Sequence, residues 1–330
     1  MVQASAVVFT APNTVEFQDV SCPDPGPGDA LVRVTHSWIS NGTEGSFLRG
    51  ERVQGDTAFR TGDPTPFPII AGYQKIGVVE WTGADIDDLA VGETVFCAMG
   101  KVEGMFHASG GQVSPSVAPR SMIWKLPSSK DPLAFSGLVL TQVGYNCGTR
   151  APIEPGEGAV VIGDGMVGQW AAQTLRCRGA KVILVGRHDD RLARFDGGET
   201  VNARTSDDWV AEVKAVARAP IAVGVDTVGD REAAMQTLGI LRREGHLVSA
   251  GFYGTDDIVS LQDLRMGEKS VDSVSGWTTP RMDAALDWIA DGRLKTLPLI
   301  THHFPVAQAA DAWRTIQSKT EHALGVILDW

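Results

Sequence analysis

The chain has 330 residues, of which 43% are hydrophobic and 21% are charged, and its formal net charge at pH 7 is −11. This length suggests about two domains, and the composition is that of a folded protein rather than a disordered one. Nucleic acids and anionic membranes attract basic patches, so an acidic chain is a poor candidate for either partner. We therefore expect a small-molecule substrate, with no nucleic acid and no membrane among the partners.

Cysteine usage and the N-terminus indicate the compartment. The four cysteines form no CxxC pair, so neither a disulfide framework nor a structural zinc loop is indicated. The N-terminus has no basic segment followed by an apolar one, and no apolar stretch approaches the ~20 residues that span a bilayer. We expect a cytoplasmic protein.

The first part of the chain contains short β-like runs separated by turn-forming residues. These runs cover residues 4–9, 30–36, 76–81 and 94–98. Proline, glycine and aspartate gather between them at 23–28 and 61–64. The pattern predicts a β-rich domain over residues 1–130.

From residue 131 to residue 275, strands and helices alternate. Strands are predicted at 158–163, 181–186, 222–226 and 246–251. Helices are predicted at 166–178, 207–218 and 232–242. Such alternation is typical of a parallel sheet with crossover helices.

The last segment, residues 276–330, mixes the two patterns. Helices are predicted at 281–292 and 306–316, and an apolar strand at 324–328. Because this strand has no helical crossover, we expect it to join the β-rich domain. That domain is then discontinuous, over 1–130 and 276–330, with a nucleotide domain over 131–275 inserted into it.

The sharpest motif is a GxGxxG, Gly163-Asp164-Gly165-Met166-Val167-Gly168, which follows a predicted strand and opens a predicted helix. In this context Gly163 permits a tight turn, Gly165 lets the backbone approach a pyrophosphate, and Gly168 lets helix and strand pack closely. Free N–H groups at the helix start, where Met166 and Val167 lie, favour an anion. We predict a dinucleotide site; a glycine-rich turn without a ligand is the alternative.

The end of the second predicted strand bears on the choice of cofactor. NAD sites usually carry Asp or Glu there, whereas this chain has Gly186 followed by Arg187, with His188 and Arg191 nearby. Losing a carboxylate and gaining a guanidinium suits the 2′-phosphate of NADP. We predict NADP(H) in preference to NAD(H). The alternatives are that Arg187 is only a surface residue, or that Asp189 takes the carboxylate's role.

Further cofactor contacts are expected where later strands of this domain end. Thr227 and Gly229 follow the strand at 222–226, and Gly251, Phe252 and Tyr253 follow the strand at 246–251. Ligands of open parallel sheets bind outside the carboxyl ends of the strands, so these five residues are candidates.

Together the two patterns, with the segment VGETV at 91–95, resemble the medium-chain dehydrogenase/reductase superfamily over essentially the whole chain. Four segments resemble its hydroxyethyl-bacteriochlorophyllide a dehydrogenase branch: WISNGTE at 38–44, GYQKIG at 72–77, AGFY at 250–253 and ILDW at 327–330. The resemblance implies an α/β fold with a GroES-like β domain and a Rossmann doubly wound parallel sheet. It also implies an NAD(P)-dependent dehydrogenase, and we expect a homo-oligomer, a dimer.

Zinc members of this superfamily hold a catalytic metal through a Cys, the His and Glu of a Gly-His-Glu motif, and a later Cys. The matching positions here hold Ser40, Tyr73, Gln74 and Val139. None of these is an ordinary zinc ligand, and Cys97 stands alone where the family's structural-zinc cysteines would gather. We predict no metal. The alternative is an improvised site from His36, Glu44, Cys97 and His107.

Without zinc, a proton donor must manage the charge that hydride transfer places on the alcohol oxygen. Tyr73 lies at the position of the metal-binding His, and Lys75 would share its face in an extended segment. A nearby ammonium group would lower the tyrosine pKa from about 10, as acid–base catalysis requires. Glu44, Ser40 and Thr43 could extend a relay to solvent. The alternative is that Tyr73 only packs and Lys75 points to solvent.

Trp277, Gln74 and His107 are the candidate substrate contacts. We expect a zinc-independent, NADP(H)-preferring oxidoreductase that interconverts a secondary alcohol and a ketone, on a sugar- or polyol-like or a bacteriochlorophyllide-like substrate. Two alternatives are an NADPH-dependent enoyl or quinone-type C=C reductase and a non-catalytic nucleotide-binding sensor.

Overall fold

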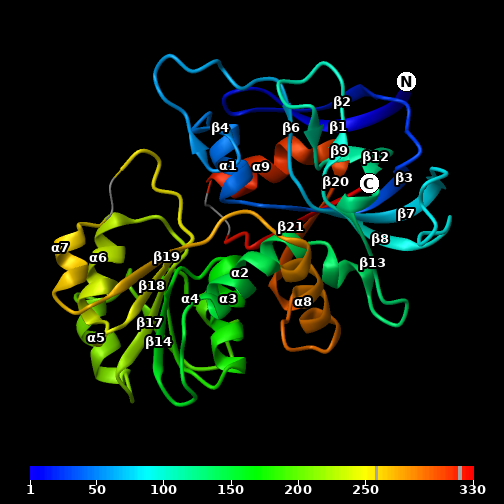
Figure 1. The fold of residues 1–330 in the computed structure, drawn as a ribbon. Coiled ribbons are helices and arrows are strands. Elements are labelled where there is room, and N and C mark those ends of the chain that lie inside the picture. The colour runs from blue at the N-terminus through cyan, green and yellow to red at the C-terminus, as the bar shows by residue number, and fades with distance from the viewer. Residues whose placement is uncertain (257–258, 319–321) are drawn as a thin grey trace. The chain divides into compact units, whose positions relative to one another are not determined.

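The computed structural model describes residues 1–256, 259–318 and 322–330, which form two compact units (Figure 1). Unit 1 comprises Met1–Val139 and Thr296–Trp330, and unit 2 comprises Leu140–Lys295. The chain thus passes between units at 139/140 and 295/296, compared with the expected boundaries of 130/131 and 275/276. Within the described ranges, no helix is both long enough and apolar enough to span a bilayer.

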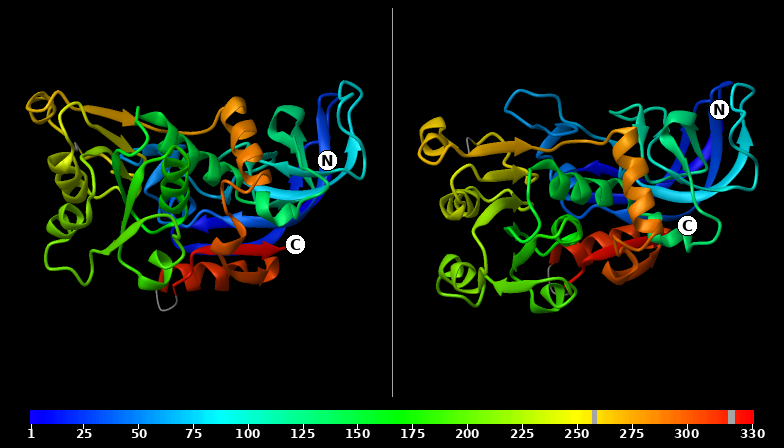
Figure 2. Two further views of the ribbon diagram at one scale, coloured as in Figure 1. Left: turned by 90° about the horizontal axis from the view of Figure 1, so that it is seen from below. Right: turned by 60° about the horizontal axis from the view of Figure 1, so that its bottom comes forward.

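The larger sheet of unit 1 brings the two ends of the chain together. Over the described residues it contains, in order, β13 (Ile123–Lys125), β8 (Thr94–Cys97), β7 (Lys75–Thr82), β3 (Asp29–Ile39), β21 (Gly325–Asp329) and β20 (Ile300–Pro305), with β12 (Ser116–Pro119) also paired with β3. The C-terminal strand β21 runs antiparallel to β3, with Val326 opposite Ile39 and Asp329 opposite His36. Figure 2 shows this last strand, in red, beside a blue strand of unit 1.

A second sheet and several short elements complete unit 1. The sheet contains β11 (Val113–Ser114), β1 (Val2–Ala11), β2 (Thr14–Cys22) and β6 (Ile69–Ile70). The short elements are α1 (Thr43–Leu48), β4 (Arg52–Gln54), β5 (Thr57–Ala58), β9 (Gly100–Lys101), β10 (Ser109–Gly110), α9 (Ala309–Ser318) and the 3-10 turns Arg120–Met122, Pro132–Phe135, Leu297–Leu299 and Val306–Gln308. Phe9 packs its ring edge-on against Trp313 of α9, so β1 and α9 share one core.

Unit 2 is a doubly wound parallel sheet, as predicted. Its strand order over the described residues is β16 (Glu199–Asn202), β15 (Lys181–Gly186), β14 (Gly158–Ile162), β17 (Ile221–Asp226), β18 (His246–Ser249) and β19 (Ser270–Ser273). The chain winds outward from β14 in both directions, and ligands of such sheets bind at the carboxyl ends of the strands near this reversal.

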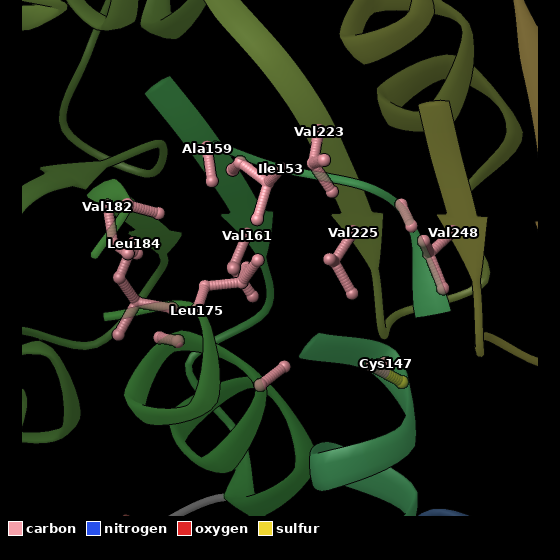
Figure 3. Close-up of a cluster of buried hydrophobic side chains, with 14 of the residues drawn as sticks. Cys147, Ile153, Ala159, Val161, Leu175, Val182, Leu184, Val223, Val225 and Val248 are labelled. Atoms are coloured by element: carbon pink, nitrogen blue, oxygen red, sulfur yellow. The ribbon is translucent and has the colours of Figure 1, made fainter. Parts of the chain in front are cut away.

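Helices cover both faces of this sheet. The described helices of this part of the chain are α2 (Leu138–Arg150), α3 (Met166–Cys177), α4 (Asp189–Leu192), α5 (Trp209–Val216), α6 (Arg231–Ile240), α7 (Leu261–Arg265) and α8 (Thr279–Ala290). On one face, Cys147 of α2 and Leu175 of α3 pack against Val161 of β14 (Figure 3). On the other face, Val213 of α5 and Leu238 of α6 share a core with Val160. Because both faces are buried, the central strands are continuously apolar, which explains why the sequence predicted them.

The strands that the sequence did not predict are short or polar. β2 leaves most of its residues exposed or half-buried, and β16 and β19 lie at the two edges of the parallel sheet. An edge strand needs only part of the apolar pattern that a central strand needs, so its signal is weak. The helix predicted at 207–218 begins later, at Trp209, because the Asp208 side chain caps it by accepting a hydrogen bond from the Ala211 amide.

Candidate functional site

The glycine motif of unit 2 has the geometry that a dinucleotide loop requires. Gly163 has φ +114°, and a Cβ there would collide with the Thr227 hydroxyl. A Cβ at Gly168 would collide with the Gly163 carbonyl, so helix α3 packs against the loop only with glycine there. A Cβ at Gly165 would meet nothing within 4 Å, which leaves that side of the loop open where α3 begins. The loop therefore fits a pyrophosphate.

The end of β15 differs from the sequence expectation in one respect. A carboxylate is present there, and it comes from Asp164, the second residue of the glycine motif. Asp164 Oδ2 accepts hydrogen bonds from the backbone amides of Arg187 (2.7 Å) and His188 (2.9 Å) and pairs with His188 Nδ1 at 2.9 Å. A Cβ at Gly186 would lie 2.5 Å from Asp164 Cβ, so glycine makes room for this side chain. The expectation that this edge has lost its anion is wrong.

The other side chains near Asp164 are arranged around it. Arg191 Nη1 lies 3.5 Å from Asp164 Oδ1, so the guanidinium group of Arg191 is directed at this carboxylate. Asp189, the alternative carboxylate, accepts a hydrogen bond from the Asn202 side chain at 2.6 Å. Arg187 is exposed.

The loops after β17 and β18 bring together five predicted cofactor residues. Gly229 has φ +82°, and a Cβ there would collide with the Phe252 backbone; a Cβ at Gly251 would collide with Gly229. Thr227 Oγ1 donates to the carbonyl of Ile162 at 2.8 Å, which fixes this loop beside β14. The two glycines thus allow the two loops to touch.

Tyr253 is anchored to a buried carboxylate that the sequence analysis did not single out. Its hydroxyl donates to Asp226 Oδ2, and the amides of Val228 (3.2 Å) and Gly229 (3.0 Å) also donate to Asp226. Asp226 is fully buried, and burial raises its pKa. Burial and the neighbouring Asp226 raise the pKa of Tyr253. Tyr253 therefore stays protonated and ties the two loops together.

In unit 1, four of the predicted catalytic residues form one hydrogen-bonded group. Tyr73 Oη donates to Ser40 Oγ at 2.6 Å, and the Thr43 side chain also hydrogen-bonds the phenol. Glu44 is 2% exposed; its Oε1 accepts from the Ser40 amide at 2.8 Å and its Oε2 accepts from Gln112 Nε2 at 2.7 Å. We call Ser40, Thr43, Glu44, Tyr73 and Gln112 the polar cluster of unit 1.

Local structure explains this grouping. Ser40 directly follows β3, Glu44 lies in the first turn of α1, and Tyr73 lies at a bend two residues before β7 begins. Because β3 and β7 pair, with Ser37 opposite Lys75, the two chain segments meet at one end of the sheet. The sequence analysis missed Gln112, which is fully buried against Gly72.

Burial keeps protons on this cluster. It raises the pKa of Glu44 to about 8, although the hydrogen bonds from the Ser40 amide and Gln112 lower it in part. Burial also raises the pKa of Tyr73, and the nearby Glu44 adds to this increase. At neutral pH, the phenol is a proton donor and much of Glu44 is a neutral acid.

The predicted role of Lys75 is wrong. Lys75 is fully buried and donates from Nζ to the carbonyl of Ala98 at 3.0 Å, and burial lowers its pKa, which nearby Cys97 and Cys22 partly offset. Tyr73 precedes the strand, so the alternation of faces does not relate it to Lys75. The pKa of Tyr73 is raised rather than lowered, and Lys75 is not among the groups that set it.

The three predicted substrate residues lie in different places. Gln74 is fully buried, and its side-chain nitrogen donates to the carbonyl of Trp38 at 3.1 Å. His107 lies between Phe47 and Phe106, and its Nε2 is buried with no hydrogen-bond partner in the described part of the chain. Trp277, in unit 2, is half-buried between β19 and α8.

Comparisons with known proteins show what the chain is similar to. A family described as zinc-binding dehydrogenase matches residues 167–291. The 2-desacetyl-2-hydroxyethyl bacteriochlorophyllide A dehydrogenase of Cereibacter sphaeroides is 25% identical over 99% of this chain and 98% of that protein. These matches support the similarity to the medium-chain dehydrogenase/reductase superfamily that the sequence motifs indicated.

Solved structures of this superfamily share the fold. A protein of Sinorhizobium meliloti 1021, solved bound to NADP, has a TM-score of 0.83 at 20% identity and covers 100% of both chains. The RspB protein of Escherichia coli CFT073, solved with NADH, has a TM-score of 0.85 at 20% identity and also covers 100% of both chains. These likenesses show that the GroES-like and Rossmann architecture predicted for the chain is correct.

No cluster of metal-binding side chains accompanies the superfamily fold. Across residues 1–256, 259–318 and 322–330, no three His, Cys, Asp or Glu side chains gather closely enough to hold a metal ion. The improvised set of His36, Glu44, Cys97 and His107 is therefore not brought together; His36, for example, lies 3.8 Å from Asp329.

Three residues of the candidate sites, Asp164, Gln112 and Asp226, were not predicted from the sequence, and their signals differed in strength. Asp164 occupies a variable position of the glycine motif, and Gln112 follows a glycine pair in an irregular segment. Asp226 had the strongest signal, because it is a carboxylate at the end of an apolar strand near the reversal of a doubly wound sheet. That position could have been found from the superfamily's architecture alone.

Proposed function

We propose that the chain is a zinc-independent, NADP(H)-preferring oxidoreductase that interconverts a secondary alcohol and a ketone. One observation carries the proposal: Tyr73 donates a 2.6 Å hydrogen bond to Ser40. The resemblance to the superfamily matches both residues to positions where its zinc members place metal ligands. Burial makes this phenol a weaker acid but keeps it protonated, and an alkoxide is a stronger base than a phenolate, so the phenol can still give its proton to the oxygen that gains charge as hydride arrives.

Unit 2 supports the cofactor part of the proposal. The open side of Gly165, the start of α3 and the touching loops at Gly229 and Gly251 suit a dinucleotide. A bound nicotinamide would supply or accept the hydride. This chain's residues would orient the cofactor, with Asp164 and its neighbours at the adenosine end.

The polar cluster of unit 1 supports the proton-transfer step of the proposal. In ketone reduction, Tyr73 gives its proton to the carbonyl oxygen as the C–H bond forms. Ser40 and Thr43 hold the phenol in place, and Glu44, with a pKa of about 8, is a nearby store from which the phenol regains its proton. Alcohol oxidation runs the same transfers in reverse.

The side chains present do not suit zinc. Ser40, Tyr73 and Gln74 offer a hydroxyl, a phenol and a carboxamide, whereas zinc in proteins takes thiolate, imidazole or carboxylate ligands. The Glu44 carboxylate already accepts two hydrogen bonds. We expect chelation and dialysis to leave turnover unchanged, with elemental analysis as the check on the metal content.

Two substrate classes have support, a bacteriochlorophyllide-like macrocycle and a sugar- or polyol-like molecule. The relative from Cereibacter sphaeroides is named for a bacteriochlorophyllide, which supports a related macrocycle as substrate. Buried polar atoms without partners in the described residues, Asn41 Oδ1, Gln112 Oε1 and His107 Nε2, support a sugar- or polyol-like substrate that offers hydroxyl groups. A panel of both classes, together with enones for the C=C reductase alternative, distinguishes them by consumption of reduced cofactor.

The substitution Tyr73→Phe tests the proton role. It removes the acid but keeps the ring, so turnover falls about 10²- to 10⁴-fold while the NADPH dissociation constant stays unchanged. Tyr145→Phe is the matched control, because the Tyr145 ring packs edge-on against Trp288 within unit 2, whereas the polar cluster belongs to unit 1. Full turnover by Tyr73→Phe would show that the assignment is wrong, and a wild-type chain that binds cofactor without turning over any substrate would favour the sensor alternative.

The remaining proposals concern the state of the protein in the cell. We propose a cytoplasmic homodimer that acts on a small molecule, with no nucleic-acid or membrane partner. Light scattering at micromolar concentration tests the dimer, and fractionation of cells tests the location.

A further inference from the structure

The end of β16 lies beside the end of β15 and brings a second arginine to the adenosine end of the cofactor site. The two strands are parallel neighbours with Gly186 opposite Asn202, and the Ala203 amide donates to the Gly186 carbonyl at 2.7 Å. The Arg204 amide donates to Asn202 Oδ1 at 2.9 Å, which fixes the backbone where the strand ends. Arg204 therefore emerges next to the segment that carries Arg187 and His188.

A hydrogen-bonded chain holds the Arg204 side chain. Arg204 Nη2 lies 3.1 Å from His188 Nε2, and His188 Nδ1 lies 2.9 Å from Asp164 Oδ2. Guanidinium groups only donate hydrogen bonds, so Nε2 accepts and the ring proton on Nδ1 is donated to Asp164. The buried Asp164 carboxylate thus fixes the imidazole, and the imidazole orients the guanidinium group.

Arg187 and Arg204, which we call the arginine pair, are exposed. They differ from Arg191 and Arg218 in having no carboxylate partner among the described residues. Neither side chain forms an ion pair with a carboxylate in the described part of the chain. Arg191 is directed at Asp164, and Arg218 pairs with Glu199 at 2.8 Å. Asp189 accepts a hydrogen bond from the Asn202 side chain at 2.6 Å. In a chain of net charge −11, two arginines without a carboxylate partner on adjacent strand ends indicate a site for an anion.

We propose that Arg204 acts with Arg187 to bind the 2′-phosphate of NADP(H), and that Asp164 and His188 are positioning residues for Arg204. The inference rests on the proposed function, since it requires that a nicotinamide dinucleotide binds at the glycine motif. Arginine suits this role because its fork of N–H groups matches phosphate oxygens and keeps its charge at any working pH.

Direct binding to the intact chain is the test, with NADPH, NADH and adenosine 2′,5′-bisphosphate as probes in calorimetric titrations. Arg204→Gln is expected to weaken NADPH and the bisphosphate about 10- to 100-fold, as for the loss of a charge-assisted hydrogen bond, while NADH affinity changes less than about twofold. Arg204→Lys keeps the charge and recovers part of the loss. Arg218→Gln is the matched control and leaves all three affinities unchanged, because Arg218 pairs with Glu199 at the start of β16, the end of that strand opposite to Arg204.

The salt dependence of NADPH affinity distinguishes a residue that binds the phosphate from one that positions the binding residue. Added salt weakens NADPH binding to Arg204→Gln less than it weakens binding to the wild type, because the variant has one fewer positive charge that interacts with the phosphate. His188→Phe removes the acceptor that orients Arg204, so it weakens NADPH several-fold but leaves the salt dependence as in the wild type, since the charge is still present.

The NADPH and NADH affinities of the wild type and the variants test both the assignment of Arg204 and the proposed function. Equal weakening of NADPH and NADH by Arg204→Gln, or no weakening of either, overturns the assignment of Arg204, while unchanged NADH affinity shows that the variant is folded. A wild-type chain that binds NADH but not NADPH overturns the proposed cofactor preference and this inference with it. A wild-type chain that binds neither dinucleotide overturns the proposed function itself.

Discussion

Glu44 and Lys75 are two buried ionisable side chains of unit 1, and burial shifts their pKa values in opposite directions. Glu44 accepts two hydrogen bonds and retains its proton up to a pKa of about 8. Lys75 donates to one carbonyl, and burial lowers its pKa. In both cases the folded chain favours the neutral form, which makes stability depend on pH in opposite directions.

Glu44→Gln is expected to stabilise the protein at alkaline pH. An unfolded glutamate has a pKa of about 4.3, so the neutral form favoured by the fold contributes fully below that pH, and the contribution is lost as pH rises through about 8. The wild type therefore loses roughly 3–5 kcal/mol between pH 4 and pH 9 from this group, and the variant does not. Gln112 can rotate its amide to accept from the new side chain, because its Oε1 has no partner among the described residues.

Urea unfolding at pH 5 and pH 9 measures this difference. Glu103→Gln is the control, because Glu103 is exposed in the same unit. Parallel pH profiles for wild type and Glu44→Gln would contradict the raised pKa.

Lys75→Met is expected to raise the melting temperature at neutral pH. Below pH ~10 the unfolded lysine is protonated, whereas burial favours the neutral amine, so stability from this group is lost as pH falls through the lowered pKa. Methionine fills the space without that penalty, at the cost of the hydrogen bond to Ala98, for a net gain on the order of 1 kcal/mol. Calorimetry at pH 7 and pH 10 is the measurement, and a gain that is larger at pH 10 would contradict the explanation.

Among the secondary-structure elements, those buried on both sides were predictable and those at edges were not. The strand at 181–186 has the predicted bounds because each of its last five residues is buried, whereas β19 was missed because its four residues, SVDS, are exposed or half-buried. In the site, the glycine motif could be predicted from local spacing. The Asp164–His188–Arg204 chain could not, because it joins three segments that only the sheet register brings together.

Substitutions of Gly165 and Gly168 are expected to differ in their effect on stability, although both weaken cofactor binding. Gly168→Ala forces a methyl group against the Gly163 carbonyl and should cost about 1–3 kcal/mol of stability, with loss of cofactor binding. Gly165→Ala meets no atom within 4 Å, so the free protein keeps its stability while NADPH affinity decreases, because the methyl group occupies the space of the pyrophosphate. Thermal unfolding and NADPH titration of both variants provide the comparison; equal destabilisation by both would contradict it.

For the molecule as a whole, cofactor binding is expected to protect unit 2 more than unit 1. NADPH at 100 times its dissociation constant adds about 2.7 kcal/mol to the free energy of unfolding of the form that binds it. The residues that fit the dinucleotide lie within Leu140–Lys295. Hydrogen exchange followed by mass spectrometry should show the increase in protection mainly in peptides of this range, and uniform protection of both units would contradict the assignment.

The pairing of β21 with β3 has a consequence for how the protein is made. β3 leads directly to Ser40, yet one of its neighbours in the sheet comes from the last residues of the chain. The ribosome makes β21 only after all of unit 2, so residues 36–39 of β3 lack this strand partner while unit 2 is synthesised. Unit 2, being continuous in sequence, can fold first. The nascent chain is thus expected to form the parallel sheet of unit 2 before the segment that follows β3 is fixed, and a chaperone that shields β-strand edges would act on unit 1 during that interval.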